Sequence, residues 1–198
     1  MKRRPRGAAL VAALACALAL PVDAAPPTGG DCAPPGDGRM RVDGADLVLH
    51  DDAGAVQARW PLRDADGRPG VPIAICRLQP RQSYAVVVGG WHELWEISTD
   101  PAAPAIFDGL VHDYRMGEAI ARPGYLGLRR IRLLQPWTAA WADGRVPWLL
   151  GAEAGAGSDA AVLHLDVRRV VGRLPWAPDG GWPAIAGRRF AWGSGPAP

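Results

Sequence analysis

Lysine is almost absent from this chain of 198 residues, because Lys2 is the only one and every other basic residue is arginine. Serine is also scarce, and none of the four serines lies in the Gly-x-Ser-x-Gly turn of an α/β-hydrolase nucleophile. The glycine-rich stretch 151–157 (GAEAGAG) lacks the lysine and the following helix of a phosphate-binding loop. These absences exclude a P-loop nucleotide site and a serine hydrolase of that class.

Cysteine is the next scarce residue, with Cys16, Cys32 and Cys76 as its three copies. No Cys-x-x-Cys, Cys-x-x-Cys-His or paired Cys/His spacing occurs, which excludes a structural zinc site and a c-type haem attachment. In an oxidising compartment Cys32 and Cys76 can pair, and closing a loop of that length stabilises the folded chain by about 4 kcal/mol. Two separate thiols fit the sequence as well.

The N-terminus has the three-part layout of a secretory signal peptide. A cationic start, MKRRPRG, precedes an apolar run over residues 8–22, and the small residues Ala24 and Ala25 follow. This run of about 15 residues is short for a membrane span, which needs roughly 20. We expect a signal peptide over residues 1–24, a periplasmic mature protein and no stable membrane span. The alternative is a lipoprotein modified at Cys16, since the sequence that ends there weakly resembles a lipoprotein cleavage site.

Cleavage also changes the charge of the chain. Removing residues 1–24 takes away four basic residues and one acidic residue, so the formal charge falls from +2 to near −1. A nucleic-acid partner needs a concentrated positive field on the protein surface. The mature sequence therefore predicts no nucleic-acid partner.

Helical sequence patterns are weak, and 25 glycines and 20 prolines make long helices improbable. The runs 71–78 and 83–90 are rich in β-formers and are separated by four polar or turn residues, which predicts a hairpin. The sequence thus predicts one all-β domain over residues 39–192. It follows a flexible Pro/Gly-rich leader over residues 25–38 and precedes a disordered tail over residues 193–198.

The domain contains an ungapped internal repeat, in which VLHDDAGAVQARWP (48–61) aligns with VLHLDVRRVVGRLP (162–175). The offset of 114 is three times 38, close to the length of one four-stranded propeller blade. A poorer third copy lies at 94–100. The fold predicted is a β-propeller-like array of about four blades, a partial or half propeller whose open edges invite pairing.

The segment 92–132 is similar to one in the periplasmic eight-bladed propellers of the haem d1 domain of cytochrome cd1 nitrite reductase and of NirF-like proteins. The resemblance rests on HELWEISTDP, GLVHDYRMGEAIA and PGYLGLRRIRL, and extends loosely over residues 40–190, about half of such a propeller. It implies a periplasmic propeller whose relatives bind a modified haem and serve nitrite reduction or haem d1 maturation. In that pattern a Pro-His-x-Gly turn faces the haem, whereas this chain has Ala184 in place of the histidine.

Four residues are the candidates for binding a cofactor. His112 can ligate iron through its imidazole, and Arg115 can hold a propionate through two parallel hydrogen bonds. Tyr114 can bond a ligand edge, and His92 follows two glycines, where backbone could approach a flat cofactor closely. The alternatives are that 112–115 is a polar loop tied to its own backbone and that His92 is a surface histidine.

The leading functional hypothesis is an exported, non-catalytic binding or accessory module similar to haem d1 proteins. Its ligand is a tetrapyrrole such as haem d1, or a protein partner of respiratory metabolism. The alternative is a structural interaction module of the cell envelope without a cofactor, which pairs through open blade edges with itself or with another periplasmic protein. A third hypothesis, an enzyme acting on nitrite or a haem precursor, is disfavoured by Ala184.

Overall fold

The computed structural model describes residues 29–30, 32–33, 35, 38–107, 121–142, 146–155 and 159–175. These residues form strands, turns and one short 3-10 helix, η1 (Gln79–Arg81), so the all-β prediction is confirmed. Among them, no helix is long and apolar enough to cross a membrane. The signal-like N-terminus and the residues 108–120 and 176–198 lie outside the described part.

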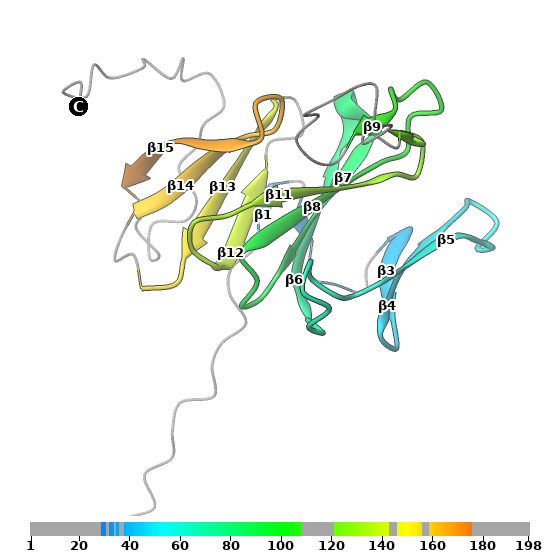
Figure 1. The fold of residues 1–198 in the computed structure, drawn as a ribbon, viewed down its shortest axis with the longest axis horizontal. Helices are drawn as coiled ribbons and strands as arrows, with labels where there is room; N and C mark the ends of the chain where they lie inside the picture. Colours follow the sequence, from blue (N-terminus) through cyan, green and yellow to red (C-terminus); the bar gives the residue numbers. More distant parts are fainter. Residues whose placement is uncertain are drawn as a thin grey trace, which may run out of the picture.

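Three antiparallel sheets follow one another like propeller blades (Figure 1). The first sheet contains β3 (Met40–Asp43), β4 (Asp46–His50) and β5 (Val56–Pro61). The central sheet contains β6 (Pro72–Leu78), β7 (Ser83–Val88), β8 (Glu93–Ser98) and β11 (Leu128–Arg132). The last sheet contains β12 (Trp137–Ala142), β13 (Trp148–Glu153), β14 (Asp159–His164) and β15 (Arg169–Pro175). A small ribbon of β9 (Ile106–Phe107) and β10 (Ala121–Arg122) lies in the connection between β8 and β11.

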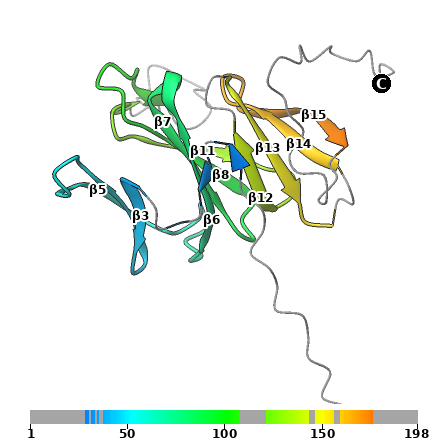
Figure 2. The same ribbon diagram turned by 180° about the vertical axis from the view of Figure 1, so that it is seen from behind.

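The central sheet lies between the first and the last sheet (Figure 2), and it is buried on both faces. All six residues of β7 and all six of β8 are buried. Burial on both faces explains why β7 is apolar at consecutive positions rather than alternating. In β8 the buried residues include Glu93 and Glu96, which form ion pairs with Arg130 and Arg81. Trp95 packs toward the first sheet and Leu94 toward the last one, beside Trp137. Each such large apolar side chain contributes about 2–3 kcal/mol on burial. The core therefore consists of two layers, one on each side of the central sheet.

The sequence repeat corresponds to equivalent hairpins, β4–β5 in the first sheet and β14–β15 in the last. The third copy is β8, the third strand of the central sheet. Only one sheet separates the two aligned copies, so the offset of 114 covers two blade steps and not the three that its divisor suggested. The reason is the long connection 99–127, which enlarges the central blade.

The two hairpins also differ in register by one residue. Val48 lies opposite Arg59, whereas its counterpart Val162 lies opposite Gly172 rather than Arg173. The turn after β4 spans residues 51–55, but the turn after β14 spans only 165–168. A turn shortened by one residue moves the return strand by one position, and side chains alternate between faces along a strand. An ungapped alignment of sequences thus hides a shift in pairing.

The leader differs from the flexible segment that the sequence predicts. Within residues 25–38, β1 (Gly29–Gly30) runs parallel to β12, and β2 (Cys32–Ala33) pairs antiparallel with β6. Cys32 and Cys76 form a disulfide, which resolves the alternatives left open by the sequence. Because β6 and β12 are the first strands of two neighbouring sheets, the leader crosses from one sheet to the next and is covalently fixed to one of them.

Candidate functional site

The described pocket with the most charged side chains lies at the end of the central sheet where β6 begins and β11 ends. This pocket, called the His92 pocket, has a volume of about 510 Å³ and is lined by Asp64, Ala65, Asp66, Arg68, His92, Glu93, Arg130 and Arg132. Its walls come from the connection 62–71, from the turn between β7 and β8, and from β11. The backbone N–H of Leu133 donates to the carbonyl of His92 at 2.8 Å and joins two of these segments.

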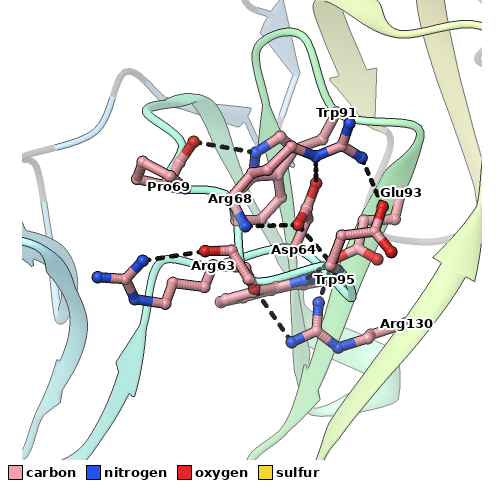
Figure 3. Close-up of polar contacts among 10 residues, drawn as sticks. Arg63, Asp64, Arg68, Pro69, Trp91, Glu93, Trp95 and Arg130 are labelled. Carbon is pink, nitrogen blue, oxygen red and sulfur yellow. Dashed lines mark hydrogen bonds and ion pairs between the residues drawn. The ribbon is translucent and has the colours of Figure 1, made fainter.

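The connection 62–71 is ordered by one buried carboxylate. Asp64 accepts hydrogen bonds from the backbone N–H groups of Asp66 at 3.0 Å and Arg68 at 2.8 Å, and its side chain is only 5% exposed. The Arg68 guanidinium donates to the same carboxylate at 2.7 Å and reaches Asp66 at 2.8 Å (Figure 3). Asp64 is therefore a structural turn residue and not one of the solvent-facing carboxylates typical of such turns.

Burial tends to raise the pKa of Asp64, but the hydrogen bonds and the charge of Arg68 outweigh it, so the pKa lies below its ordinary value. The pKa of Arg68 is raised, chiefly by its side-chain hydrogen bond to Asp64 and by the attraction between the two charges. Both shifts favour the charged forms. The pair is consequently ionised throughout the neutral range and holds the wall of the pocket in place.

Glu93 and Arg130 form a second ion pair, and their polar groups are likewise bonded to other residues of the protein. The buried Glu93 carboxylate accepts from the indole Nε1 of Trp95 at 2.8 Å and makes an ion pair with Arg130. The Arg130 guanidinium lies over the Trp95 ring, 5.0 Å from its centroid, and donates to the carbonyl of Arg63 at 3.1 Å (Figure 3). A cation over an indole face is an attractive contact in itself. Arg130 is thus committed to the fold.

His92 and Arg132 are the two groups left for a ligand. Both are exposed, and neither side chain makes a hydrogen bond or ion pair with any other residue in the part of the chain that the structure describes. Arg132 lies opposite Glu93 in the strand register, but the Glu93 carboxylate bonds to Arg130 and Trp95 instead. An unpaired guanidinium beside an imidazole is suited to a carboxylate ligand, which arginine binds through two parallel hydrogen bonds.

The glycines before His92 serve the chain itself. Gly90 has φ 76°, a backbone conformation that a tight turn needs and that other residues rarely adopt. A Cβ at Gly89 would lie 3.1 Å from Ile73. Nearby, a Cβ at Gly70 would lie 2.3 Å from the ring of Trp91, so the absence of a side chain at Gly70 leaves room for that ring. Turn geometry and packing therefore account for the glycines that suggested a cofactor surface.

The structure brings only one of the predicted site residues to this pocket. His112, Tyr114 and Arg115 lie outside the described residues, as does Ala184. Sequence reasoning missed Arg68, Arg130 and Arg132. For the last two, the only signal in the sequence was the density of arginine in 129–132. The described residues contain no group of three or more His, Cys, Asp or Glu side chains that could hold a metal.

Comparisons with known proteins give one likeness of fold. No protein-family model matches the chain, and no curated protein matches it. The solved structures that are similar to it include dihydro-heme d1 dehydrogenase NirN, in complex with DHE, with a TM-score of 0.51 and 22% sequence identity. The match covers 74% of this chain and 28% of the NirN chain. The fold is that of a β-propeller of the haem d1 type. The likeness extends no further than the fold, and the chain spans less than a third of that solved chain.

Proposed function

We propose that this chain is an exported, non-catalytic binding module that holds a carboxylate-bearing tetrapyrrole at the His92 pocket. The proposal rests on Arg132 and His92, which line the same pocket and whose side chains have no partner among the described residues. The other charged side chains that line this pocket form ion pairs with one another. The d1-like propeller fold supports the ligand class, because the similar NirN structure is a complex with DHE. The disulfide supports export, since such bonds persist in oxidising compartments.

The lining of the pocket fits one part of such a ligand better than another. Guanidinium and imidazole groups suit the carboxylates at the edge of a tetrapyrrole, and His92 offers one nitrogen that could ligate iron. The flat faces of the macrocycle need apolar walls, and Ala65 is the one apolar residue that lines the pocket. The described residues would therefore hold the acidic edge. An iron tetrapyrrole, when bound, would supply ligand exchange and electron transfer.

A non-catalytic role is favoured by how the carboxylates are used. Asp64 is bonded to Arg68 and to two backbone amides, and Glu93 is bonded to Arg130 and Trp95. A general acid or base must be able to exchange its proton near the operating pH. Asp64, whose pKa is lowered, is poorly suited to that task, and the Glu93 carboxylate is bonded to fixed partners within the protein. His112, Tyr114 and Arg115 remain predicted contributors to the same function.

The test is an absorbance titration of the protein with haemin, followed by competition with a carboxylate-blocked haemin ester. We expect a shifted Soret band for the wild type, binding about tenfold weaker for Arg132→Ala, and an altered band position for His92→Ala. Arg41→Ala is the matched control, because Arg41 is an exposed arginine on β3, away from the pocket. An unchanged haemin spectrum in the wild type, or equal losses in Arg41→Ala and Arg132→Ala, would remove the proposal.

One observation favours the alternative function, a module that associates with a second copy of itself. Val71 and Leu134 are 74% and 73% exposed, and both lie in connections that lead from the last strand of one sheet to the first strand of the next. Exposed aliphatic groups at equivalent places on one face are typical of an interaction surface. Sedimentation equilibrium should then show a dimer that Val71→Ser with Leu134→Ser dissociates. A wild-type monomer at high concentration rules this alternative out.

A further inference from the structure

A second cavity lies at the opposite end of the central sheet, between that sheet and the first one. Its volume is about 290 Å³, and we call it the Gln82 cavity; it is lined by Arg39, Leu49, Gln57, Arg77, Leu78, Gln79, Gln82, Ser83, Tyr84, Thr99 and Tyr125. These residues come from η1 and the adjoining ends of β6 and β7, from both ends of the connection 99–127, and from the first sheet and the residue before it. Neither the repeat nor the His92 pocket accounts for this group of side chains.

The chemistry of the Gln82 cavity differs from that of the His92 pocket. No carboxylate lines it, whereas two arginines and three glutamines do. Arg39 is partly used, since it donates to the carbonyl of His50 at 2.9 Å and lies 3.3 Å from the exposed carboxylate of Asp52. With the Gln79 carboxamide turned so that its oxygen faces Arg77, that oxygen lies 3.3 Å from Nε and from Nη1 of the guanidinium. The cavity thus offers a cation together with neutral groups that can both donate and accept.

Gln82 is held in an unusual backbone conformation at the wall of this cavity. Its φ is 46° and its ψ is 51°, in the left-handed region that favours glycine. The carbonyl of Gln82 accepts two hydrogen bonds from Thr99, one from the backbone N–H at 2.6 Å and one from Oγ1 at 2.9 Å. The N–H of Gln82 donates to the carbonyl of Gln79 at 3.0 Å. Strained positions that the surroundings enforce in this way are concentrated at ligand sites.

Tyr125 is positioned by a second constrained turn. A Cβ at Gly124 would lie 2.1 Å from the carbonyl oxygen of Pro104, so only glycine fits there. Tyr125 forms an isolated parallel β-bridge with Ser98. The next residue, Leu126, has φ 54°, and its backbone N–H donates to the Ser98 carbonyl at 2.8 Å. The two left-handed residues Gln82 and Leu126 therefore flank one cavity. The Tyr125 side chain, 41% exposed, is presented at its mouth.

We propose that the Gln82 cavity binds an acidic sugar unit, with the sugar carboxylate at Arg77 and the sugar hydroxyls at the carboxamides. An inorganic anion needs donors alone, whereas a sugar hydroxyl donates and accepts at once and is matched by carboxamide and hydroxyl side chains. Three carboxamides provide that second kind of partner, and an exposed tyrosine offers a ring face to the sugar. The hydroxyls of Ser83 and Thr99 already donate to Glu96 and to the Gln82 carbonyl, so they can only accept from the sugar. A cavity of 290 Å³ is at the small end of ligand sites, which suits one sugar ring.

The experiment is isothermal titration of the full chain with D-glucuronate, D-glucose and sulfate as separate probes. We expect glucuronate to bind with a Kd of about 1 mM and each of the other two at least about tenfold more weakly. Arg77→Ala should abolish detectable glucuronate binding. Gln82→Gly should weaken it about fivefold while keeping the left-handed backbone, because glycine adopts that conformation freely. Arg41→Ala, at an exposed position on β3 that lines neither pocket, is the control that should bind glucuronate like the wild type.

Two outcomes overturn the proposal. Sulfate that binds as tightly as glucuronate, with no effect of Gln82→Gly, would mean a plain anion site. No heat from glucuronate at about 50 mM would mean no site of this affinity. Circular dichroism of each variant shows whether a loss of binding reflects a loss of fold. In that case Arg77→Gln, which keeps a polar side chain but removes the charge, replaces Arg77→Ala.

Discussion

The two ends of the central sheet use charge in opposite ways. At the His92 end three carboxylates and three arginines line one pocket, and most of these charges are bound to one another. At the Gln82 end no carboxylate lines the cavity, and the shape is set instead by left-handed backbone and by a glycine that nothing larger can replace. Ion pairs that hold a loop together are not available to a ligand. The difference teaches that a charged pocket must be judged by its unpaired groups and not by its total charge.

Two glycine substitutions should separate the two ends, and they carry the largest expected effect. A methyl group at Gly70 would meet Trp91 at 2.3 Å, and one at Gly124 would meet the backbone of Pro104 at 2.1 Å. Overpacking of this kind costs about 1–3 kcal/mol of unfolding free energy. We expect Gly70→Ala to weaken haemin binding but not glucuronate binding, and Gly124→Ala to do the reverse. Urea denaturation and the two titrations measure this; equal effects on both ligands would contradict the separation.

Removing the buried partner at the His92 end should have the next largest effect. Glu93→Ala leaves the Arg130 guanidinium and the indole N–H of Trp95 without their shared acceptor. Because Arg130 is partly exposed, we expect a loss of about 2 kcal/mol, below the range for a fully buried pair. Urea denaturation of Glu93→Ala against Asp66→Ala, whose carboxylate is 74% exposed, checks this. A loss in Asp66→Ala that equals the loss in Glu93→Ala would mean that burial does not govern these pairs.

The smallest expected effect is on the pH dependence of stability. The pKa of Asp64 is lower in the folded state, so below about pH 4 the unfolded chain binds the proton more readily. The stabilisation from Asp64 is therefore present above the ordinary carboxyl pKa and is lost as the pH falls through it. Asp64→Asn should flatten the acid limb of a plot of thermal midpoint against pH between 6 and 3. A limb as steep as that of the wild type would show that Asp64 is not its source.

The sequence predicts the fold because each sheet carries a local signal. Consecutive apolar residues in 71–78 and 83–90 indicated strands covered on both faces, and the structure buries all six residues of β7 and most of those of β6. The repeated hairpins were identified because a strand, a turn around an aspartate and a return strand are contiguous in sequence. The count of blade steps was wrong because the insertion after β8 has no counterpart elsewhere in the chain.

The site was much less predictable, for a physical reason. The His92 pocket draws on 64–68, 92–93 and 130–132, three segments that become neighbours only when β11 pairs with β8. A single sequence does not reveal which arginine meets which carboxylate across such distances. The leader strands were not predicted for another reason, because Gly29–Gly30 and Cys32–Ala33 are too short to show any periodicity.

The leader has a practical consequence for anyone who shortens this protein. A version that begins at residue 29 retains both short strands and the Cys32 thiol, whereas one that begins at residue 34 exposes the edges of β6 and β12 together and leaves Cys76 as a single reactive sulfur. Removing those five residues should therefore leave unpaired strand edges at the junction of neighbouring sheets, where other chains can associate.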